Sequence, residues 1–131
     1  MEREWKRYEG TAQRELFRSL RERFLRRHQA PSGWTLEVGP GPGRFSAWVG
    51  GQGARRVQID LSREMLRAAA RTWGDDGDPK GRPERIEADG VHPPFRPRTF
   101  SEVVVLGNAV GFAGEAADRM VDRLLELVGP G

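Results

Sequence analysis

Apolar residues recur every four positions between residues 11 and 28, and charged residues occupy most of the positions between them. This spacing places the apolar side chains along one face of an α-helix. Pro31 and Gly33 follow the periodic stretch and stop it. The pattern therefore predicts an amphipathic helix within an N-terminal helical segment, residues 1–30. Its apolar stripe consists of Ala12, Leu16, Leu20 and Phe24, broadened by Phe17 and Leu25.

Short apolar runs after this helix predict four β-strands, at residues 34–38, 56–59, 84–88 and 103–106. Further helices are expected at residues 44–49, 62–73 and 115–128. Ser62 is a suitable N-cap for the helix at 62–73. The run Val103–Leu106 contains no polar residue, which is typical of a strand that is buried on both faces of a sheet.

The two longer helices of this part of the chain each carry an apolar side through which they are expected to pack. For the helix at 62–73, that side consists of Met65, Leu66, Ala69 and Trp73. The final helix is expected to bury Ala116, Met120, Val121, Leu124, Leu125 and Val128.

The alternation of strands and helices indicates the fold class. A strand, a helix and a second strand in succession form a right-handed crossover within a parallel sheet, which helices then cover on its faces. The chain has 131 residues, a length that suits one domain. We therefore predict a single α/β domain over residues 1–131, with a doubly wound core at residues 34–128.

Composition narrows the classes of function. The chain contains no cysteine, which excludes disulfides, thiolate chemistry and cysteine-ligated metal sites. Its two histidines, His28 and His92, lie far apart in the sequence, so no metal site is expected. The longest weakly polar run, Val103–Gly114, is too short for a membrane-spanning helix, and no secretory signal is visible. We expect a cytoplasmic domain that binds a cofactor or another ligand and does not contact a membrane.

Basic residues are unusual in kind more than in number. The 22 lysines and arginines exceed the 19 acids by three, and all but Lys6 and Lys80 are arginine. Arginine binds phosphate well, so contact with nucleic acid stays open. The arginines are spread along the chain and interleaved with acids, however, which favours a bias of genome composition or an adaptation to heat.

Glycines and acids stand where three of the predicted strands end. Gly39, Gly41 and Gly43 follow the first strand, Asp60 follows the second and Asp89 follows the third. Ligands of doubly wound folds bind beyond these strand ends. Glycines let the backbone approach a ligand closely, and carboxylates can accept hydrogen bonds from ribose hydroxyls or from the amino group of a purine. Together these residues indicate a cofactor that contains a nucleoside.

The spacing of the glycines separates the candidate cofactors. The dinucleotide-binding fingerprint G-x-G-x-x-G has a small residue where this chain has Arg44, which disfavours an NAD-dependent oxidoreductase. No Gly-Lys-Ser/Thr follows the turn, which excludes a phosphate-binding P-loop.

Three segments in this order resemble the motifs of the class I S-adenosylmethionine-dependent methyltransferases, of the kind called methyltransferase type 11. Residues 36–45, LEVGPGPGRF, resemble the glycine-rich first motif of the family. Residues 57–66, VQIDLSREML, resemble the next motif, an acid followed by Ser-x-x-Met-Leu. Residues 88–100 are similar to the stretch with Ala-Asp-Ala, Pro-Phe and Ser-Phe-Asp, although Ser101 replaces its final acid. The resemblance covers residues 34 to 128.

The resemblance implies a Rossmann-like sheet with the strand order 3-2-1-4 and S-adenosylmethionine as the cofactor. In the first motif it implies that Glu37 steadies the turn or binds the amino group of the cofactor. It also implies that the backbone passes under the methionine and ribose portions of the cofactor at Gly39, Gly41 and Gly43.

The later motifs imply the remaining contacts with this cofactor. Asp60 is expected to bind the ribose hydroxyls, and Asp89 is expected to accept from the adenine amino group. Residues expected beside these groups are Leu61 and Met65 near the adenine, Gly90 next to Asp89, and Asn108 facing the sulfonium and the methyl acceptor.

The acceptor itself is unknown. Strand four is followed by GNAV rather than by the Asn/Asp-Pro-Pro-aromatic tetrapeptide of methylases that act on base or glutamine amino groups, so a small molecule is favoured. No residue is an evident general base, because His92 lies among prolines. An RNA methyltransferase remains an alternative, since Trp5 and Tyr8 lie within a basic N-terminal segment. The other alternative is a non-catalytic or truncated methyltransferase-like binding module.

The family's sheet has seven strands, and the spacing of the predicted strands accounts for four of them. We therefore expect strands five to seven to be absent. An exposed apolar edge at residues 103–106 would favour pairing with another chain, so we expect either a homo-oligomer or a missing C-terminal segment to cover that edge.

Overall fold

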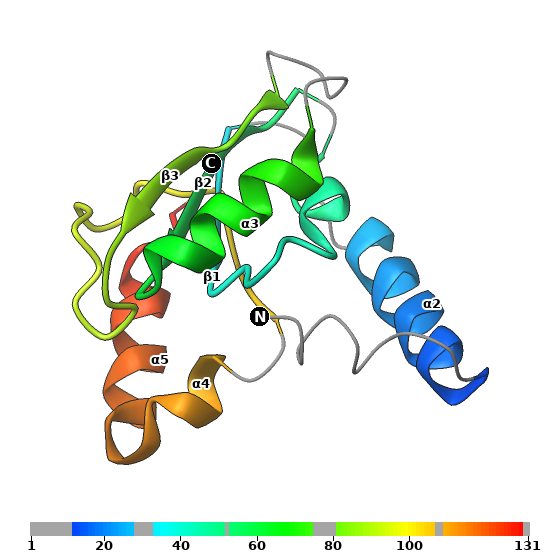
Figure 1. The fold of residues 1–131 in the computed structure, drawn as a ribbon. Helices are drawn as coiled ribbons and strands as arrows, with labels where there is room; N and C mark the ends of the chain where they lie inside the picture. Colours follow the sequence, from blue (N-terminus) through cyan, green and yellow to red (C-terminus); the bar gives the residue numbers. More distant parts are fainter. Residues whose placement is uncertain (1–11, 28–32, 52, 75–80, 107–108, 130–131) are drawn as a thin grey trace.

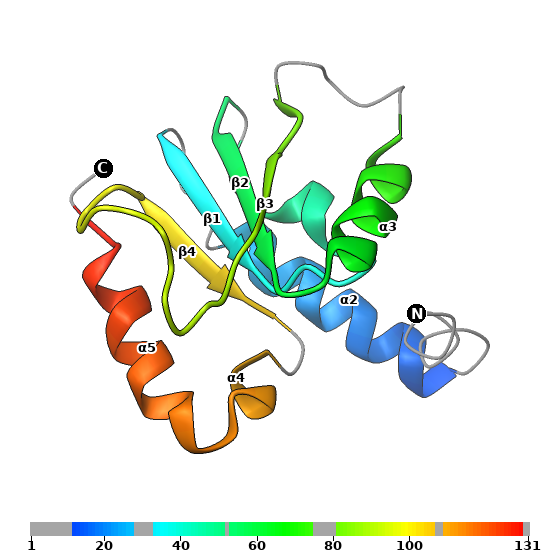
Figure 2. The ribbon, with the colours of Figure 1, turned by 60° about the vertical axis from the view of Figure 1, so that its left-hand side comes forward.

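The computed structural model describes residues 12–27, 33–51, 53–74, 81–106 and 109–129. Within these residues four strands form one sheet; Figure 1 shows the fold, and Figure 2 labels all four strands. Its neighbouring strands are all parallel, in the order β3-β2-β1-β4. This confirms the predicted α/β, Rossmann-like sheet. The strands are β1 (Trp34–Val38), β2 (Arg55–Asp60), β3 (Glu84–Glu87) and β4 (Glu102–Val105).

Helices cover both faces of this sheet, and Figure 2 shows α3 and α5 on opposite sides of it. One face carries α2 (Ala12–Arg27), the 3-10 turn η1 (Ser46–Trp48) and α3 (Arg63–Trp73). The other carries α4 (Ala109–Phe112), the 3-10 turn η3 (Gly114–Ala116) and α5 (Ala117–Glu126). The sheet is therefore doubly wound, as predicted.

Successive side chains of β4 point to opposite faces and divide the core in two. Val103 and Val105 pack against the larger cluster, whose buried members include Leu36, Ile59, Phe100, Met120 and Leu124. Val104 packs against a smaller cluster of Leu25, Phe45 and Val49. The larger cluster joins α5 to the sheet, and the smaller one joins α2 and η1 to it.

The helix predicted at 11–28 is confirmed as α2, but three residues of its apolar stripe face solvent. An amphipathic helix ordinarily turns such a stripe to the core. Here Leu16, Leu20 and Phe24 are 59%, 50% and 58% exposed. Among the α2 side chains that the structure describes, only Leu25 is buried. Among the described side chains, the contact of α2 with the core is therefore narrow.

Two expected helices differ from the structure. The one predicted at 44–49 is wrong, because only η1 forms between Gly43 and Gly50; so short a segment does not repay the cost of nucleating an α-helix. The one predicted at 115–128 begins later, at Ala117, and α4 precedes it, which sequence periodicity did not indicate. Gly114, with φ of +59°, separates α4 from α5.

The buried side of α5 is narrower than predicted. Met120 and Leu124 are buried, and so is Leu127, which the sequence analysis did not include. Three residues expected to be buried are instead exposed: Val121, Leu125 and Val128. Ala116 is half-buried. One row of positions four and three residues apart faces the sheet, and the other apolar positions lie on the outer side.

β4 was expected to be buried on both faces, and this is wrong. All four of its residues are half-buried, because β4 pairs only with β1 within the described sheet. A parallel bridge between Phe100 and Val128 lies just before the strand. No helix of the described residues is both long and apolar enough to span a bilayer.

Candidate functional site

A cavity of about 400 Å³ opens beyond the carboxyl ends of the strands. This volume lies within the range of small-molecule sites, which is ~300–1,000 Å³. Most of the site residues expected from the sequence line the cavity: Glu37, Gly39, Gly41, Asp60, Leu61, Met65, Asp89 and Gly90. Gly43 does not belong to its lining, and Asn108 lies outside the described residues.

The turn after β1 forms one wall of this cavity. The N–H of Gly43 donates to the carbonyl oxygen of Pro40 at 3.0 Å, which closes a β-turn around Gly41 and Pro42. Gly41 has φ of +56°, and the ring of Pro42 holds its own φ near −65°. This combination is that of a type II′ turn, which strongly favours glycine at the first central position. The sequence Pro-Gly-Pro-Gly thus determines the shape of the wall.

Gly43 has a different task from Gly41. A Cβ atom on Gly43 would lie 3.1 Å from the Cα atom of Ala69 in α3, whereas a Cβ atom on Gly41 would meet nothing within 4 Å. Gly43 therefore lets α3 approach the turn closely. Gly41 is needed for its positive φ, and it leaves the adjoining space open.

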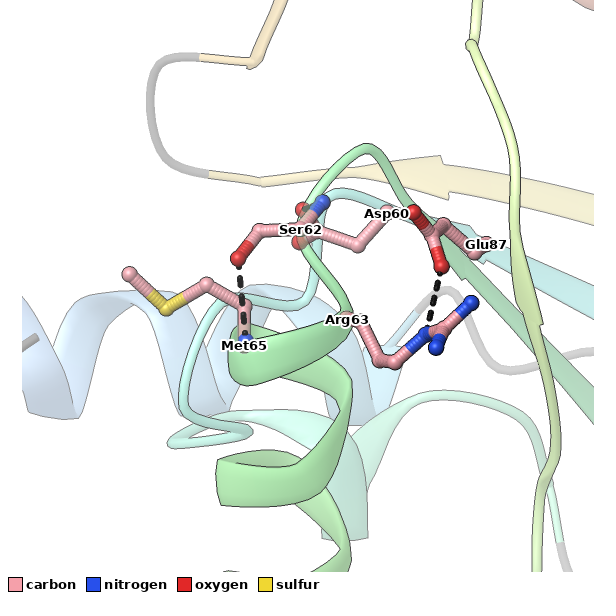
Figure 3. Close-up of polar contacts among 5 residues, drawn as sticks. All are labelled: Asp60, Ser62, Arg63, Met65 and Glu87. Carbon is pink, nitrogen blue, oxygen red and sulfur yellow. Dashed lines mark hydrogen bonds and ion pairs between the residues drawn. The ribbon is translucent and has the colours of Figure 1, made fainter.

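Asp60, the last residue of β2, connects this turn to the start of α3. Its Oδ1 accepts from the N–H of Ser62 at 2.9 Å, and its Oδ2 lies 3.4 Å from the N–H of Gly41. Ser62 is the N-cap of α3, as predicted, because its hydroxyl oxygen accepts from the N–H of Met65 at 3.2 Å (Figure 3). Figure 3 also shows Arg63 paired with Glu87 at 2.8 Å, which ties α3 to the end of β3.

Asp89 shapes the loop that follows β3. Its Oδ1 accepts from the N–H of Val91 at 2.9 Å, and its carbonyl oxygen accepts from the N–H of His92 at 3.0 Å. A Cβ atom on Gly90 would lie 2.7 Å from Cε of Met120. The loop therefore packs tightly against α5 and presents a carboxylate at the cavity.

Glu37 is the buried acid of the site, with 4% of its surface exposed. Its Oε1 accepts two hydrogen bonds of 2.8 Å, from Oγ of Ser46 and from Nε2 of Gln58. Burial raises the pKa of Glu37 above its ordinary value, and these two hydrogen bonds and the charges of Arg85 and Arg56 oppose that rise. The carboxyl group thus depends on a polar network for its charge.

The sequence analysis missed the partners of Glu37. Gln58 is 1% exposed, and its Oε1 accepts from Nε of Arg85 at 2.8 Å. A signal was present in the sequence, because Gln58 interrupts the apolar run of β2 between Val57 and Ile59. A buried amide in a strand requires polar partners nearby.

A second group that the sequence analysis missed makes part of the cavity apolar. These residues come from the end of β4 and from the α4–α5 segment: Leu106, Ala109, Ala113 and Met120. Leu61, which also lines the cavity and precedes α3 by two residues, is 70% exposed.

The site therefore combines three carboxylates, a turn with exposed backbone and an apolar wall. Such a set suits an organic ligand with hydroxyl and amino groups. Among the described residues, no cluster of three or more histidines and acids could hold a metal ion.

Comparison with known sequences gives one family. The family model of a methyltransferase domain matches residues 35–131, about three quarters of the chain. No curated protein sequence matches significantly.

Comparison with solved structures agrees with the fold. The PH0226 protein of Pyrococcus horikoshii is 22% identical, with a TM-score of 0.73, and the match covers 94% of this chain and 56% of that one. A candidate S-adenosylmethionine-dependent methyltransferase of Methanococcus maripaludis is 18% identical, with a TM-score of 0.66 and coverages of 88% and 52%. An S-adenosylmethionine-dependent methyltransferase of Methanosarcina mazei is 20% identical, with a TM-score of 0.67 and coverages of 82% and 53%. The chain spans about half the length of these structures.

Proposed function

Because the chain belongs to the methyltransferase-domain family, we propose that it is the cofactor-binding core of an S-adenosylmethionine-dependent methyltransferase and binds this cofactor in the cavity beyond β1, β2 and β3. The observation that carries the proposal is the meeting of Asp60, Asp89 and the Gly41 turn around one cavity. These residues come from three separate motifs, and each provides a group that a nucleoside requires.

The geometry of these residues supports the proposed ligand. Oδ2 of Asp60 accepts a long hydrogen bond from the N–H of Gly41, at 3.4 Å, and its second lone pair can accept from a ribose hydroxyl. Asp89 uses Oδ1 to hold its own loop, so Oδ2 is the atom that would accept from the adenine amino group. Leu61 and Met65 would pack against the adenine ring, and Glu37 would bind the ammonium of the methionine portion.

The chemistry of transfer would require little of the protein. Bound S-adenosylmethionine supplies a methyl group that its sulfonium already makes electrophilic. Asp60 and Asp89 would orient the ligand, and the apolar wall of Leu106, Ala109 and Met120 would exclude water. An in-line displacement then needs an acceptor held about 3 Å from the methyl carbon, which is a matter of positioning.

We propose a small molecule as the methyl acceptor. The apolar wall of Leu106, Ala109, Ala113 and Met120 supports this, because it offers apolar contact area to an acceptor. The cation in the described lining, Arg44, lies in the glycine-rich turn instead. Trp5 and Tyr8, which kept RNA open as an acceptor, lie outside the described residues.

Isothermal titration calorimetry with S-adenosylhomocysteine, the demethylated product, tests the binding proposal. We expect saturable binding that Asp60→Ala weakens at least tenfold, since a hydrogen-bonded carboxylate at the ribose would be lost. Asp122→Ala is the matched control, because it removes an exposed acid on α5 and should leave affinity unchanged. Absence of heat with the unchanged chain, or binding of NAD instead, would refute the proposal.

A binding module without transferase activity is the second candidate. The cavity lining supports it, because among the described residues it contains no histidine, lysine or tyrosine that could take a proton from an acceptor. A methyl-transfer screen with radiolabelled S-adenosylmethionine against small molecules, RNA and protein separates the two. Labelled product identifies the enzyme and its acceptor class, whereas binding without transfer to any pool identifies the module.

A further inference from the structure

Glu37, Gln58 and Arg85 form a polar row across three strands. Glu37 of β1 is the register partner of Gln58 in β2, and Gln58 is the partner of Arg85 in β3. Side chains at paired positions of a parallel sheet project from the same face. Hydrogen bonds of 2.8 Å join Arg85 Nε to Gln58 Oε1 and Gln58 Nε2 to Glu37 Oε1. The row thus runs from the edge of the sheet to the cavity.

Arg85 determines which way the amide of Gln58 faces. A guanidinium group only donates, so the carbonyl oxygen of Gln58 must face Arg85 and the NH₂ group must face Glu37. In the opposite orientation, two donors would meet at Arg85 and an amide oxygen would meet the carboxylate. Arg85 therefore favours a donor at Glu37 without contacting that residue.

The position of Arg85 in this row lowers the stability of the fold. Its Nη2 atom is buried and has no hydrogen-bond partner among the described residues. Burial lowers the pKa of Arg85, as does the neighbouring charge of Arg82, while Glu37 opposes this effect. A buried donor without a partner destabilises a fold, so packing alone does not account for an arginine at this position.

We propose that Gln58 and Arg85 are positioning residues that keep the Glu37 carboxylate ionised for the α-ammonium group of the methionine portion of the ligand. The proposal rests on the proposed function. An ionised carboxylate in a largely apolar cavity attracts an ammonium group strongly, whereas a protonated one offers only a weak hydrogen bond. The specificity of the site for an amino acid moiety would then originate at the far edge of the sheet.

Other charged groups near Glu37 also affect the ionisation of its carboxyl group. Arg56 of β2 acts with Arg85 to favour the ionised form. Arg44, Asp60 and Asp89 line the same cavity, from the glycine-rich turn, the end of β2 and the loop after β3. None of these replaces the hydrogen bond from Gln58. Oγ of Ser46 still donates to Oε1 when Gln58 is substituted, so the variant removes one of the two hydrogen bonds to Glu37.

Two ligands distinguish a positioning role of Gln58 and Arg85 from a general loss of stability in the variants. S-Adenosylhomocysteine carries the α-ammonium group, whereas 5′-methylthioadenosine keeps the nucleoside and lacks the amino acid portion. In Gln58→Met and in Arg85→Gln, we expect S-adenosylhomocysteine to bind about tenfold more weakly, the loss of one charge-assisted hydrogen bond. Affinity for 5′-methylthioadenosine should stay unchanged in both variants.

Matched variants test whether Arg85 acts on Glu37 by orienting Gln58. Arg82→Gln removes a neighbouring, exposed cation, and we expect it to leave both affinities unchanged. Arg85→Lys keeps a charged donor and should recover part of the affinity for S-adenosylhomocysteine. Arg85 is only half-buried, so Arg85→Gln tests the proposal even if Gln58→Met fails to fold.

The pH dependence of binding provides a further readout. With its donor removed, Glu37 should take up a proton at a higher pH than in the unchanged chain. Over the pH range in which an α-amino group stays largely protonated, affinity for S-adenosylhomocysteine should then rise with pH more steeply in Gln58→Met.

The outcomes distinguish this inference from the function on which it rests. If the unchanged chain binds neither ligand, the proposed function fails. If it binds both, and Gln58→Met and Arg85→Gln weaken the two ligands equally or leave S-adenosylhomocysteine unaffected, the positioning role is overturned.

Discussion

The N–H of Gly41 lies 3.4 Å from Oδ2 of Asp60, nineteen residues further along the chain. The contact joins the turn after β1 to the end of β2 and brings a backbone donor and a carboxylate to the same wall of the cavity. A ligand hydroxyl bound by Asp60 would therefore lie against the backbone of Gly41. The conformation of this one glycine is thus coupled to the acid that we expect to bind the ribose.

Substitution of Gly41 should separate folding from binding. Gly41→Ala meets no steric obstacle, but it forces alanine into a positive φ, which costs about 1–2 kcal/mol. We expect urea unfolding to show this loss and calorimetry to show weakened binding of S-adenosylhomocysteine, because the added methyl group and any relaxation of the turn alter the cavity wall.

Gly53 provides the control for this prediction. It also has a positive φ, +83°, with nothing within 4 Å of an added Cβ atom, and it lies outside the cavity lining. Gly53→Ala should lose similar stability and retain full affinity. Equal affinities in the two variants would show that the Gly41 turn does not contact the ligand.

Local patterns predicted those parts of the fold that depend on local sequence. The end of β2 at Asp60 and the cap at Ser62 follow from residues within a few positions of each other. The row of Glu37, Gln58 and Arg85 could not be predicted in the same way, because it depends on the register of three strands that are distant in sequence. Gln58 signalled a buried polar site but did not identify its partners.

The packing of α2 illustrates the same limit. Periodicity predicts that a stripe exists but not whether another element lies against it. Leu20 belongs to the predicted stripe and is half-exposed, whereas Leu25, at the margin of the stripe, is buried with Phe45 and Val49. Tertiary contacts therefore selected a different side of the helix from the one that the sequence emphasised.

The two leucines of α2 should consequently differ in their effect on stability. Leu25→Ala creates a cavity in the smaller core cluster and should lower the free energy of unfolding by about 2–4 kcal/mol. Leu20→Ala removes a side chain that is 50% exposed and should cost less than about 1 kcal/mol. Urea denaturation of both variants measures the difference, and similar losses would contradict the observed packing.

The two edge strands of the described sheet, β3 and β4, differ in how well their sequences prevent pairing with another chain. The sequence of β3 is Glu-Arg-Ile-Glu, and such charges discourage pairing with another chain. β4 presents Glu-Val-Val-Val and, within the described residues, pairs only with β1. We therefore propose that either a second copy of the chain or a further C-terminal segment covers this edge. In the first case, we expect sedimentation velocity to show a concentration-dependent dimer.

The exposed stripe of α2 is the competing surface for such a dimer. Leu16→Lys combined with Leu20→Lys would disrupt association through α2 and leave β4 intact. Persistence of the dimer in this variant is the expected result. If the variant no longer forms a dimer, the interface includes α2 and not β4. If the unchanged chain is a monomer at all concentrations, self-association is contradicted.

Glu37 should make stability depend on pH in a direction opposite to that of an ordinary paired carboxylate. Burial raises its pKa in the folded state above the unfolded value, so the folded chain retains a proton that the unfolded chain has lost. Glu37 therefore contributes most to stability below the unfolded pKa. This contribution declines as the pH rises from about 4.5 through the folded pKa, by at most about 1.4 kcal/mol for each increase of one in pH.

Glu37→Gln isolates this effect, because the variant cannot titrate at that position and nearly preserves the shape of the side chain. The difference in unfolding free energy, unchanged chain minus variant, should fall as the pH rises from about 4.5 through the folded pKa, as measured by urea denaturation at a series of pH values. A difference that is constant over this range would show that the folded and unfolded pKa values are equal. The same variant should bind S-adenosylhomocysteine more weakly while it retains affinity for 5′-methylthioadenosine. A carboxylate that lowers stability at neutral pH but strengthens binding is one retained for the ligand rather than for the fold.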